Sequence, residues 1–219
     1  MSNLIVVGDS FCSAADKWPK QLADLLNLNL YCYGHPGSSW WTARNYLLTL
    51  ENSIIKNCEV VVACHTNAER IPTLNNEILN LQSITDPIRK LEIEKAIKLY
   101  KVYIENNDFL HWCQTKWFLE FSNMFAHSKQ INLHCFPYSY SNRQYLTGCN
   151  LFPSLIEISL GELDVNLNNM TTIQNDVRGN HFSIENNSNL ANELYSIIKN
   201  YKVGDQFFNL NNFIQKERK

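Results

Sequence analysis

The sequence predicts a three-layer α/β/α fold with a flavodoxin-like, mostly parallel sheet of about five strands. Short apolar runs rich in β-branched residues recur along the chain, as in residues 4–7 and 60–62. Such runs are typical of strands that are covered on both faces. Segments with helical spacing separate them, and this alternation favours parallel strands with helices on both sides. A length of 219 residues, 45% of them hydrophobic, suits one domain with a sizeable core.

Five segments are predicted as strands. The first contains the run "LIVV" and ends at Gly8, where a glycine allows the backbone to turn sharply. The third, "CEVVVACH", is predicted to be another buried strand. The five segments are 4–8, 28–33, 58–65, 131–136 and, as a possible fifth strand, 154–160.

Helices are expected between these strands. Apolar residues recur at helical spacing from Trp18 to Leu26, and Ser38 or Ser39 caps a helix that runs to about residue 56. Residues 86–127 are predicted to form a helical insertion, and Ser183 caps a last helix. These elements make up a single domain over 1–203, followed by a peripheral C-terminal tail over 204–219.

Composition excludes several classes of protein. A net charge of -2, from 19 basic and 21 acidic residues, gives no basic footprint for nucleic acid. No apolar run approaches ~18 residues, so no membrane span is expected. The predicted strand at residue 4 leaves no room for a signal peptide, which favours a cytoplasmic location. The seven cysteines form no C-x-x-C pair and are predicted to be reduced, mostly buried thiols. The oligomeric state stays open.

Polar and glycine residues mark the carboxyl ends of the predicted strands. In a flavodoxin-like order the first and third strands flank the point where ligands bind, so Ser10 and Asn67 are expected along one crevice. Capping of helices does not require so many polar positions at one edge. The segments concerned are "GDS" at 8–10, "GHPG" at 34–37, "HTN" at 65–67 and "DVRGNHFS" at 176–183.

In these segments the sequence resembles the SGNH (GDSL-type) hydrolases. "VVGDSFC" is similar to the family's first block, which implies that Ser10 is the nucleophile. "HPGSS" resembles the glycine block, in which Gly37 aligns best with the oxyanion glycine and Gly34 is the fallback. "HTNA" resembles the asparagine block, so Asn67 takes that role, and "RGNH" resembles the final block, with His181 as general base.

The order and spacing of these blocks hold over about residues 3–200. The segment "NHFS" at the start of the last helix is also similar to small phage-type SGNH-like proteins. If the chain is encoded by a phage, an association with the virion is a further possibility for its location.

Two positions depart from the family's pattern. Ala68 follows Asn67 where the family has an aspartate, and Arg178 stands three residues before His181, in the place of the triad aspartate. Two arrangements stay open: Asp176 orients the histidine in a triad, or a main-chain carbonyl orients it in a Ser-His dyad. Arg178 would hold Asp176 ionised or contact an anionic group of the substrate.

The resemblance implies a serine hydrolase that cleaves a small ester through an acyl-enzyme, without cofactor or metal. An acetyl or short acyl ester, on a carbohydrate or a lipid, is the expected substrate. A serine hydroxyl becomes nucleophilic when a histidine takes its proton. The N–H groups of Ser10 and Gly37 and the amide of Asn67 would stabilise the oxyanion. A non-catalytic binding module on the same fold is the alternative, because fold does not imply function.

The remaining histidines and Cys12 are weaker candidates. His35 and His65 neighbour the proposed site and are possible substrate contacts, although loop histidines are usually solvated. The six histidines show no paired spacing of metal ligands, so no metal site is expected. Cys12 lies two residues after Ser10 and is predicted to be a buried structural thiol.

Overall fold

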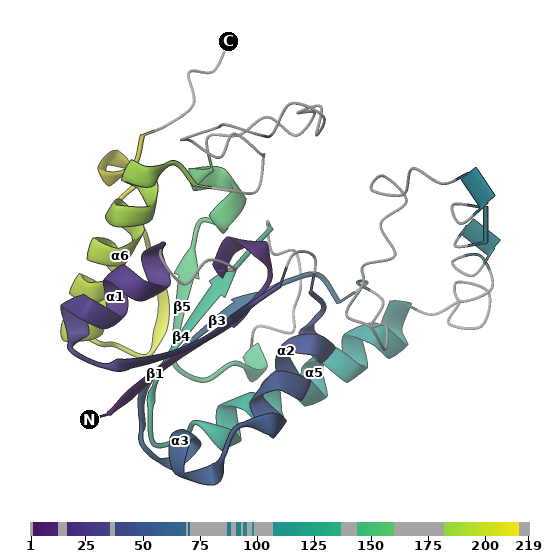
Figure 1. Ribbon diagram of the computed structural model, residues 1–219, viewed down its shortest axis with the longest axis horizontal. Coiled ribbons are helices and arrows are strands. Elements are labelled where there is room, and N and C mark those ends of the chain that lie inside the picture. The colour runs from purple at the N-terminus through teal and green to yellow at the C-terminus, as the bar shows by residue number, and fades with distance from the viewer. Residues whose placement is uncertain are drawn as a thin grey trace.

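The computed structural model describes the greater part of the chain. Its six strands all belong to one sheet, which forms the centre of the described part (Figure 1). The described residues are 2–12, 17–35, 38–68, 70, 87–88, 91–92, 94–95, 98, 107–136, 144–159 and 182–214.

The sheet is parallel throughout, with the strand order β2-β1-β3-β4-β5-β6. This order places β1 between β2 and β3, which is the flavodoxin-like switch point that the sequence predicts. The predicted fold class is therefore confirmed. The strands are β1 (Asn3–Gly8), β2 (Asn29–Gly34), β3 (Cys58–His65), β4 (Lys129–His134), β5 (Cys149–Phe152) and β6 (Gly204–Phe207).

The first four predicted strands are present, but the fifth was placed wrongly. Residues 154–160 contain a 3-10 turn, Leu155–Ile158, and the strand lies before it at Cys149–Phe152. The reason is local: Ser154 and Glu157 form a capping box, in which the backbone N–H of Ser154 donates to Glu157 Oε1 over 3.3 Å. The Ser154 hydroxyl donates to the same oxygen over 2.7 Å. The sixth strand, β6, lies in the segment expected as a peripheral tail and pairs with β5 at the edge of the sheet.

Helices cover both faces of the sheet (Figure 1). Ser39 caps α2 and Ser183 caps α6, as the sequence predicts. The helix expected up to residue 56 is divided in two, because the chain is extended at Leu50 and Glu51. The helices are α1 (Trp18–Leu26), α2 (Trp40–Thr49), α3 (Asn52–Lys56), α5 (Asn107–Met124) and α6 (Ile184–Lys199).

Two hydrophobic layers result from the alternation of side chains along the strands. Leu4 and Val6 of β1 point toward α1 and α6, while Ile5 and Val7 point toward α2 and α5. We call these the α1–α6 layer and the α2–α5 layer.

Helix α5 is the crossover between β3 and β4 and covers the second part of the predicted insertion. Most of 86–106, the remainder of that insertion, lies outside the described residues, and the boundaries of the domain and tail stay predictions. In the described part of the chain, no helix is long and apolar enough to span a membrane.

Candidate active site

The carboxyl ends of β2, β1 and β3 lie side by side, and the segments that follow them form the candidate site. Gly8 pairs with Gly34 across β1 and β2, and Val7 pairs with Ala63 across β1 and β3. Ser10 therefore begins a 3-10 turn, Ser10–Cys12, at the same edge at which β3 ends before Asn67. We call this edge the carboxyl edge.

Gly8 is required where β1 passes β3. A Cβ at this position would lie 2.5 Å from the Cβ of Cys64 and 2.8 Å from its carbonyl oxygen. The sequence suggested a glycine for a sharp turn, but the physical reason is the close approach of two backbones. The Ser10 turn is thus held directly against the end of β3.

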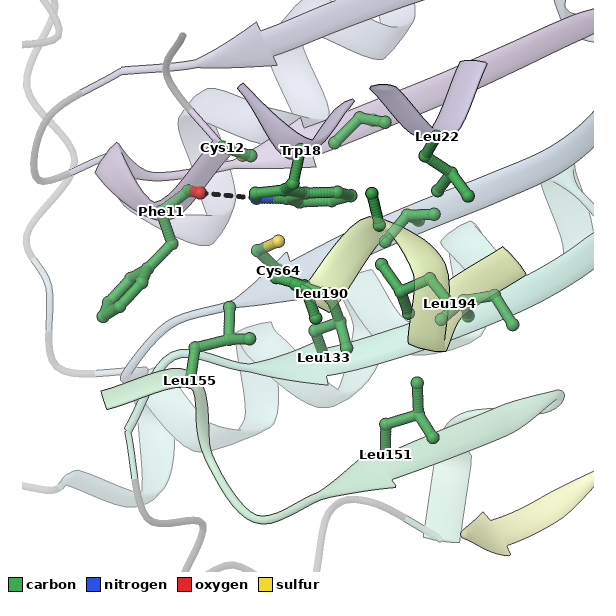
Figure 2. Close-up of a cluster of buried hydrophobic side chains, with 14 of the residues drawn as sticks. Phe11, Cys12, Trp18, Leu22, Cys64, Leu133, Leu151, Leu155, Leu190 and Leu194 are labelled. Carbon is green, nitrogen blue, oxygen red and sulfur yellow. Dashed lines mark hydrogen bonds between the residues drawn. The ribbon is translucent and has the colours of Figure 1, made fainter. Parts of the chain in front are cut away.

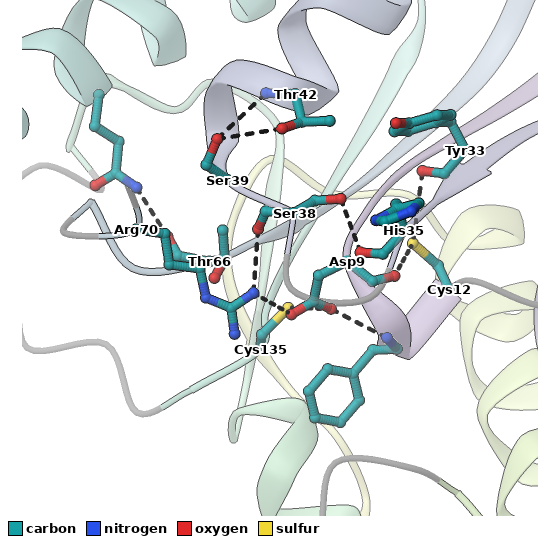
Figure 3. Close-up of polar contacts among 12 residues, drawn as sticks. Asp9, Cys12, Tyr33, His35, Ser38, Ser39, Thr42, Thr66, Arg70 and Cys135 are labelled. Atoms are coloured by element: carbon teal, nitrogen blue, oxygen red, sulfur yellow. Dashed lines mark hydrogen bonds and ion pairs between the residues drawn. The ribbon is translucent and has the colours of Figure 1, made fainter. Parts of the chain in front are cut away.

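Asp9 braces the Ser10 turn. Its Oδ1 accepts a hydrogen bond from the backbone N–H of Phe11 over 3.0 Å and from the thiol of Cys135 over 3.3 Å. Its Oδ2 accepts from Arg70 Nη1 over 3.1 Å. Figure 3 shows Arg70, which follows β3, and Cys135, which follows β4, beside the carboxylate of Asp9. Both carboxylate oxygens of Asp9 therefore accept hydrogen bonds that hold the Ser10 turn in place.

Burial and charge act on Asp9 in opposite directions. Its side chain is 1% exposed, and burial raises the pKa of its carboxyl above 3.8. The nearby guanidinium of Arg70 and the N–H of Phe11 lower that pKa in part. A buried carboxylate needs such partners, since leaving it unpaired costs several kcal/mol.

Arg70 also reaches the segment after β2. The same Nη1 donates to the carbonyl oxygen of Ser38 over 3.1 Å (Figure 3). The guanidinium lies over the ring of Phe136, 5.1 Å from its centroid. Arg70 thus joins the segments that follow β1, β2 and β3.

The segment after β2 is closed on itself. The backbone N–H and the hydroxyl of Ser38 both donate to the carbonyl oxygen of His35, over 3.0 and 2.8 Å. Ser39 then caps α2, because its hydroxyl accepts from the N–H of Thr42. His35 is exposed at this edge, whereas Gly37, the expected oxyanion residue, lies outside the described residues.

His65, expected as a possible substrate contact, is buried in the α2–α5 layer. Its Nε2 donates to Oδ1 of Asn132 over 2.9 Å, because the amide nitrogen of Asn132 is used by the carbonyl oxygen of Thr147. The rings of Phe118 and Phe121 pack edge-on against it. Burial lowers the pKa of His65 to about 4, so the imidazole is neutral at pH 7. A ligand could therefore contact His65 only from within the α2–α5 layer.

A small hollow lies beside His65 and under the carboxyl edge. Three buried polar atoms in and around it have no hydrogen-bond partner within the described part of the chain: Trp40 Nε1, Thr66 Oγ1 and Gln114 Oε1. Buried polar atoms are normally paired, so these three can receive a hydrogen-bonding group. The residues that line the hollow are Val7, Gly8, Ser39, Trp40, Ala43, Ala63, Cys64, His65, Thr66 and Trp117.

The thiols around the Ser10 turn are structural. All seven cysteines are free, and Cys12 and Cys135 are fully buried. The hydrogen bond with Cys64 and burial raise the pKa of Cys12 well above 9.0, and burial does the same for Cys135. Because a thiolate is the reactive form, Cys12 is not an activated nucleophile, in agreement with the sequence prediction.

The final sequence block is only partly described. Asp176, Arg178 and His181 lie outside the described residues. Phe182, however, is buried, and its ring centroid lies 5.4 Å from that of Phe11. The residue that follows His181 therefore contacts the residue that follows Ser10.

No metal-binding group of three or more His, Cys, Asp or Glu side chains occurs among the residues that the structure describes. The described residues at the carboxyl edge are instead the Ser10 turn, the buried Asp9, Arg70 and Asn67. The hydroxyl of Ser10 and the amide of Asn67 are groups that can hydrogen-bond to an ester, because the charge of Arg70 is matched by Asp9.

Comparisons with known proteins give three similar chains among the solved structures. Neither a protein-family model nor a curated protein matches the sequence. One solved structure, described as "a putative lipolytic protein of G-D-S-L family from Desulfitobacterium hafniense DCB-2", has a TM-score of 0.42 and 14% identity, covering 90% of this chain and 99% of its own. Another, described as "a putative SGNH hydrolase from Slackia heliotrinireducens", has a TM-score of 0.33 and 14% identity, covering 64% of this chain and 59% of its own.

Both descriptions name the family that the sequence blocks resemble. Both TM-scores lie below 0.5, so the chemistry of the candidate site rests on this chain's own residues.

Sequence reasoning missed Arg70 and Asn132. A buried Asp9 requires a cationic partner, but the sequence contains 19 lysines and arginines and does not indicate which of them pairs with Asp9. Asn132 lies within a strand, where an isolated polar residue gives no signal until its neighbour His65 is known. Only the position of Arg70, three residues after Asn67, could have drawn attention to it.

Proposed function

We propose that the protein is a serine hydrolase that cleaves a small ester, with an acetyl or short acyl group, through an acyl-enzyme on Ser10. The observation that carries this proposal is the meeting of three sequence blocks at one edge of the sheet. Ser10 follows β1, Asn67 follows the neighbouring β3, and Phe182 brings the start of α6 against Phe11. His181 directly precedes Phe182 in the chain, which supports its role as the base for Ser10.

The proposed reaction uses groups of this chain alone. His181 takes the proton of Ser10 Oγ as that oxygen bonds to the acyl carbon. The N–H groups of Ser10 and Gly37 and the amide of Asn67 stabilise the oxyanion, each donor contributing roughly 3 kcal/mol. When the C–O bond to the alcohol breaks, His181 returns the proton to the leaving oxygen. Water then attacks the acyl-enzyme in the same way, and the carboxylic acid leaves.

The hollow supports a short acyl group. It lies next to Gly8 and Thr66, two residues from Ser10 and one from Asn67, and large rings of Trp40 and Trp117 close it. A narrow, partly polar space with room for about one water-sized group suits the methyl of an acetyl group better than a longer alkyl chain. The alcohol part of the ester, carbohydrate or lipid, would lie outside it, where His35 and Arg178 are the proposed contacts.

Hydrolysis of p-nitrophenyl acetate tests the proposal. We expect turnover by the wild type and losses of more than about 10³-fold in Ser10→Ala and His181→Ala, since the nucleophile and base act as one unit. Ser13→Ala is the matched control, because this serine is a close neighbour of Ser10 that no sequence block assigns a role. Equal rates in all four proteins would contradict the proposal.

The third member of the machinery is tested separately. Asp176→Asn should lower the rate at saturating ester by 10³–10⁴-fold, as an order of magnitude, if Asp176 orients His181 in a triad. A loss of less than about tenfold, or ~1.4 kcal/mol, would leave a Ser-His dyad. The five-residue spacing slightly favours the dyad, because it differs from the family's three.

A non-catalytic binding module is the second candidate. Ala68 stands where the family has an aspartate, and it is fully buried, so no carboxylate is available at this position. An unreactive Ser10 combined with saturable binding of an acetylated sugar would favour the module over the enzyme.

A further inference from the structure

Arg70 connects the three segments that the proposed reaction requires to be fixed. It belongs to the segment after β3, and through one nitrogen, Nη1, it donates to Asp9 after β1 and to Ser38 after β2, each over 3.1 Å. Asp9 in turn holds the N–H of Phe11. The segment that contains Ser38 is closed onto His35 around the predicted oxyanion residue Gly37.

We propose that Arg70 is a positioning residue that locks the Ser10 turn and the Ser38 segment onto the Asn67 segment before the substrate binds. This inference rests on the proposed hydrolase, because the three segments supply the nucleophile and the oxyanion donors. Oxyanion stabilisation depends on donors that are already in place, and a shift of about 1 Å can cost ~10² in rate.

The surroundings of Arg70 favour positioning over recognition of a substrate anion. Its guanidinium faces a carboxylate that is 1% exposed, and Phe136 covers one side of the group. The charge of Arg70 is therefore matched by Asp9 inside the protein. A guanidinium that is committed in this way orders its neighbours and offers little net charge to a ligand.

If Arg70 had a purely structural role, it would only neutralise the charge of Asp9. A positioning role also requires its hydrogen bond to the carbonyl oxygen of Ser38, so this bond distinguishes the two roles. Replacing Asp9 and Arg70 together by uncharged residues leaves no unpaired carboxylate. The carbonyl oxygen of Ser38, however, still lacks the hydrogen bond from Arg70. Arg70→Lys offers a conservative substitution, since one ammonium group can donate to both oxygens as Nη1 does.

The experiment measures the rate at which a fluorophosphonate probe labels Ser10 in the folded protein, together with the melting temperature. Arg70→Met should slow labelling by between about tenfold and a hundredfold, and Arg70→Lys should recover most of the rate. Asp9→Asn with Arg70→Met should regain the melting temperature lost in Arg70→Met but not its labelling rate. A labelling rate of the double variant within about threefold of the wild type would overturn the positioning role.

Arg44→Met is the matched control. Arg44 pairs with Glu120 over 2.8 Å and lies over the ring of Trp41 at 5.3 Å, but on the outer side of α2 and α5. This variant should lose stability without slowing the labelling of Ser10. If it slows labelling as much as Arg70→Met does, the positioning role is overturned.

Amide hydrogen exchange tests the inference even if the wild type is not labelled and the hydrolase proposal fails. Arg70→Met should accelerate exchange at the N–H groups of Phe11, Cys12 and Ser38, which are hydrogen-bonded in the two segments that Arg70 holds. Arg44→Met should not. Unchanged protection at all three amides in Arg70→Met would overturn the positioning role.

Discussion

The two layers on either side of the sheet differ in how completely their polar groups are paired. In the α1–α6 layer, Asn187 accepts from the N–H of Trp18 and donates to two carbonyl oxygens near the start of α6. Asn186 makes three hydrogen bonds, including two with Ile214. In the α2–α5 layer, Trp40 Nε1, Thr66 Oγ1 and Gln114 Oε1 have no partner within the described part of the chain.

The side chains around these polar groups differ as well. Figure 2 shows the α1–α6 layer filled by leucines around Trp18, whose Nε1 donates to the carbonyl oxygen of Phe11 over 2.8 Å. The α2–α5 layer is aromatic and contains the buried His65–Asn132 pair and the hollow. Unpaired buried polar groups and incomplete packing are expected where a protein binds a ligand, because functional sites depart from the usual rules of core packing and hydrogen bonding. Among the described residues, the unpaired polar groups and the hollow thus lie in the α2–α5 layer, whereas the α1–α6 layer contributes the Phe11–Phe182 contact and a core of closely packed leucines.

The largest effect on stability should come from the α1–α6 layer. Leu194 is fully buried against the sheet, and Leu194→Ala should lower the free energy of unfolding by about 3 kcal/mol. Urea unfolding measures this loss. Ester turnover by the folded variant at 25 °C should stay near that of the wild type, and a tenfold loss would contradict the separation of the two layers.

His65 should make stability depend on pH. Its folded pKa of about 4 lies below its usual 6.5, so between these values the unfolded chain binds a proton that the folded protein does not. Stability should therefore be complete above pH 6.5 and fall by up to about 3 kcal/mol as the pH drops to 4.

The variant His65→Gln, whose amide can still donate to Asn132, tests this pH dependence. Its free energy of unfolding, measured against the wild type between pH 4 and 7, should vary less steeply with pH. Parallel curves for the two proteins would show that His65 is not the titrating group.

Trp18 and Trp40, two of the three buried tryptophans, provide a matched pair, one in each layer. Trp18→Phe removes a hydrogen-bonded indole and leaves the Phe11 carbonyl unpaired, so it should cost about 2 kcal/mol of stability. Trp40→Phe removes an N–H that has no partner among the described residues, beside the hollow, and should cost about 1 kcal/mol or less. Equal losses in chemical denaturation would remove the distinction between the layers.

The smallest effect concerns the acyl group. Trp40→Phe enlarges the hollow, so it should raise turnover of p-nitrophenyl butyrate relative to the acetate by up to about tenfold, given ~0.8 kcal/mol per buried CH₂. Trp18→Phe should leave this ratio unchanged. A ratio that shifts in both variants, or in neither, would place the acyl group elsewhere.

Strands β1 to β4 could be predicted because each contains a run or an alternation of apolar residues, which is the pattern of a strand whose faces are covered. The fifth strand was misplaced because its segment, "CNLF", is only four residues long and contains no β-branched residue. The segment "SLIEISL" is longer and has more apolar residues. Leu155 and Ile158, three residues apart and both buried, follow the period of a turn. Strand β6, "GDQF", lies at an edge and needs no apolar pattern.

The site could be predicted where chemistry leaves a local pattern and not where it depends on long-range partners. Ser10 and Asn67 stand out because polar residues follow apolar runs. The partner of Asp9 is Arg70, 61 residues away, and that of His65 is Asn132, 67 residues away. Their pairing is a property of the folded chain, because the sheet order brings the ends of β1, β3 and β4 together.

Labelling by a fluorophosphonate probe, mapped by mass spectrometry of proteolytic peptides, tests most directly that Ser10 is an activated nucleophile. We predict one adduct on the peptide containing Ser10 in the wild type, none in Ser10→Ala, and strongly slowed labelling in His181→Ala. A wild-type protein that is folded by thermal melting yet shows no adduct on Ser10, or an adduct that persists at the same rate in His181→Ala, would contradict the account.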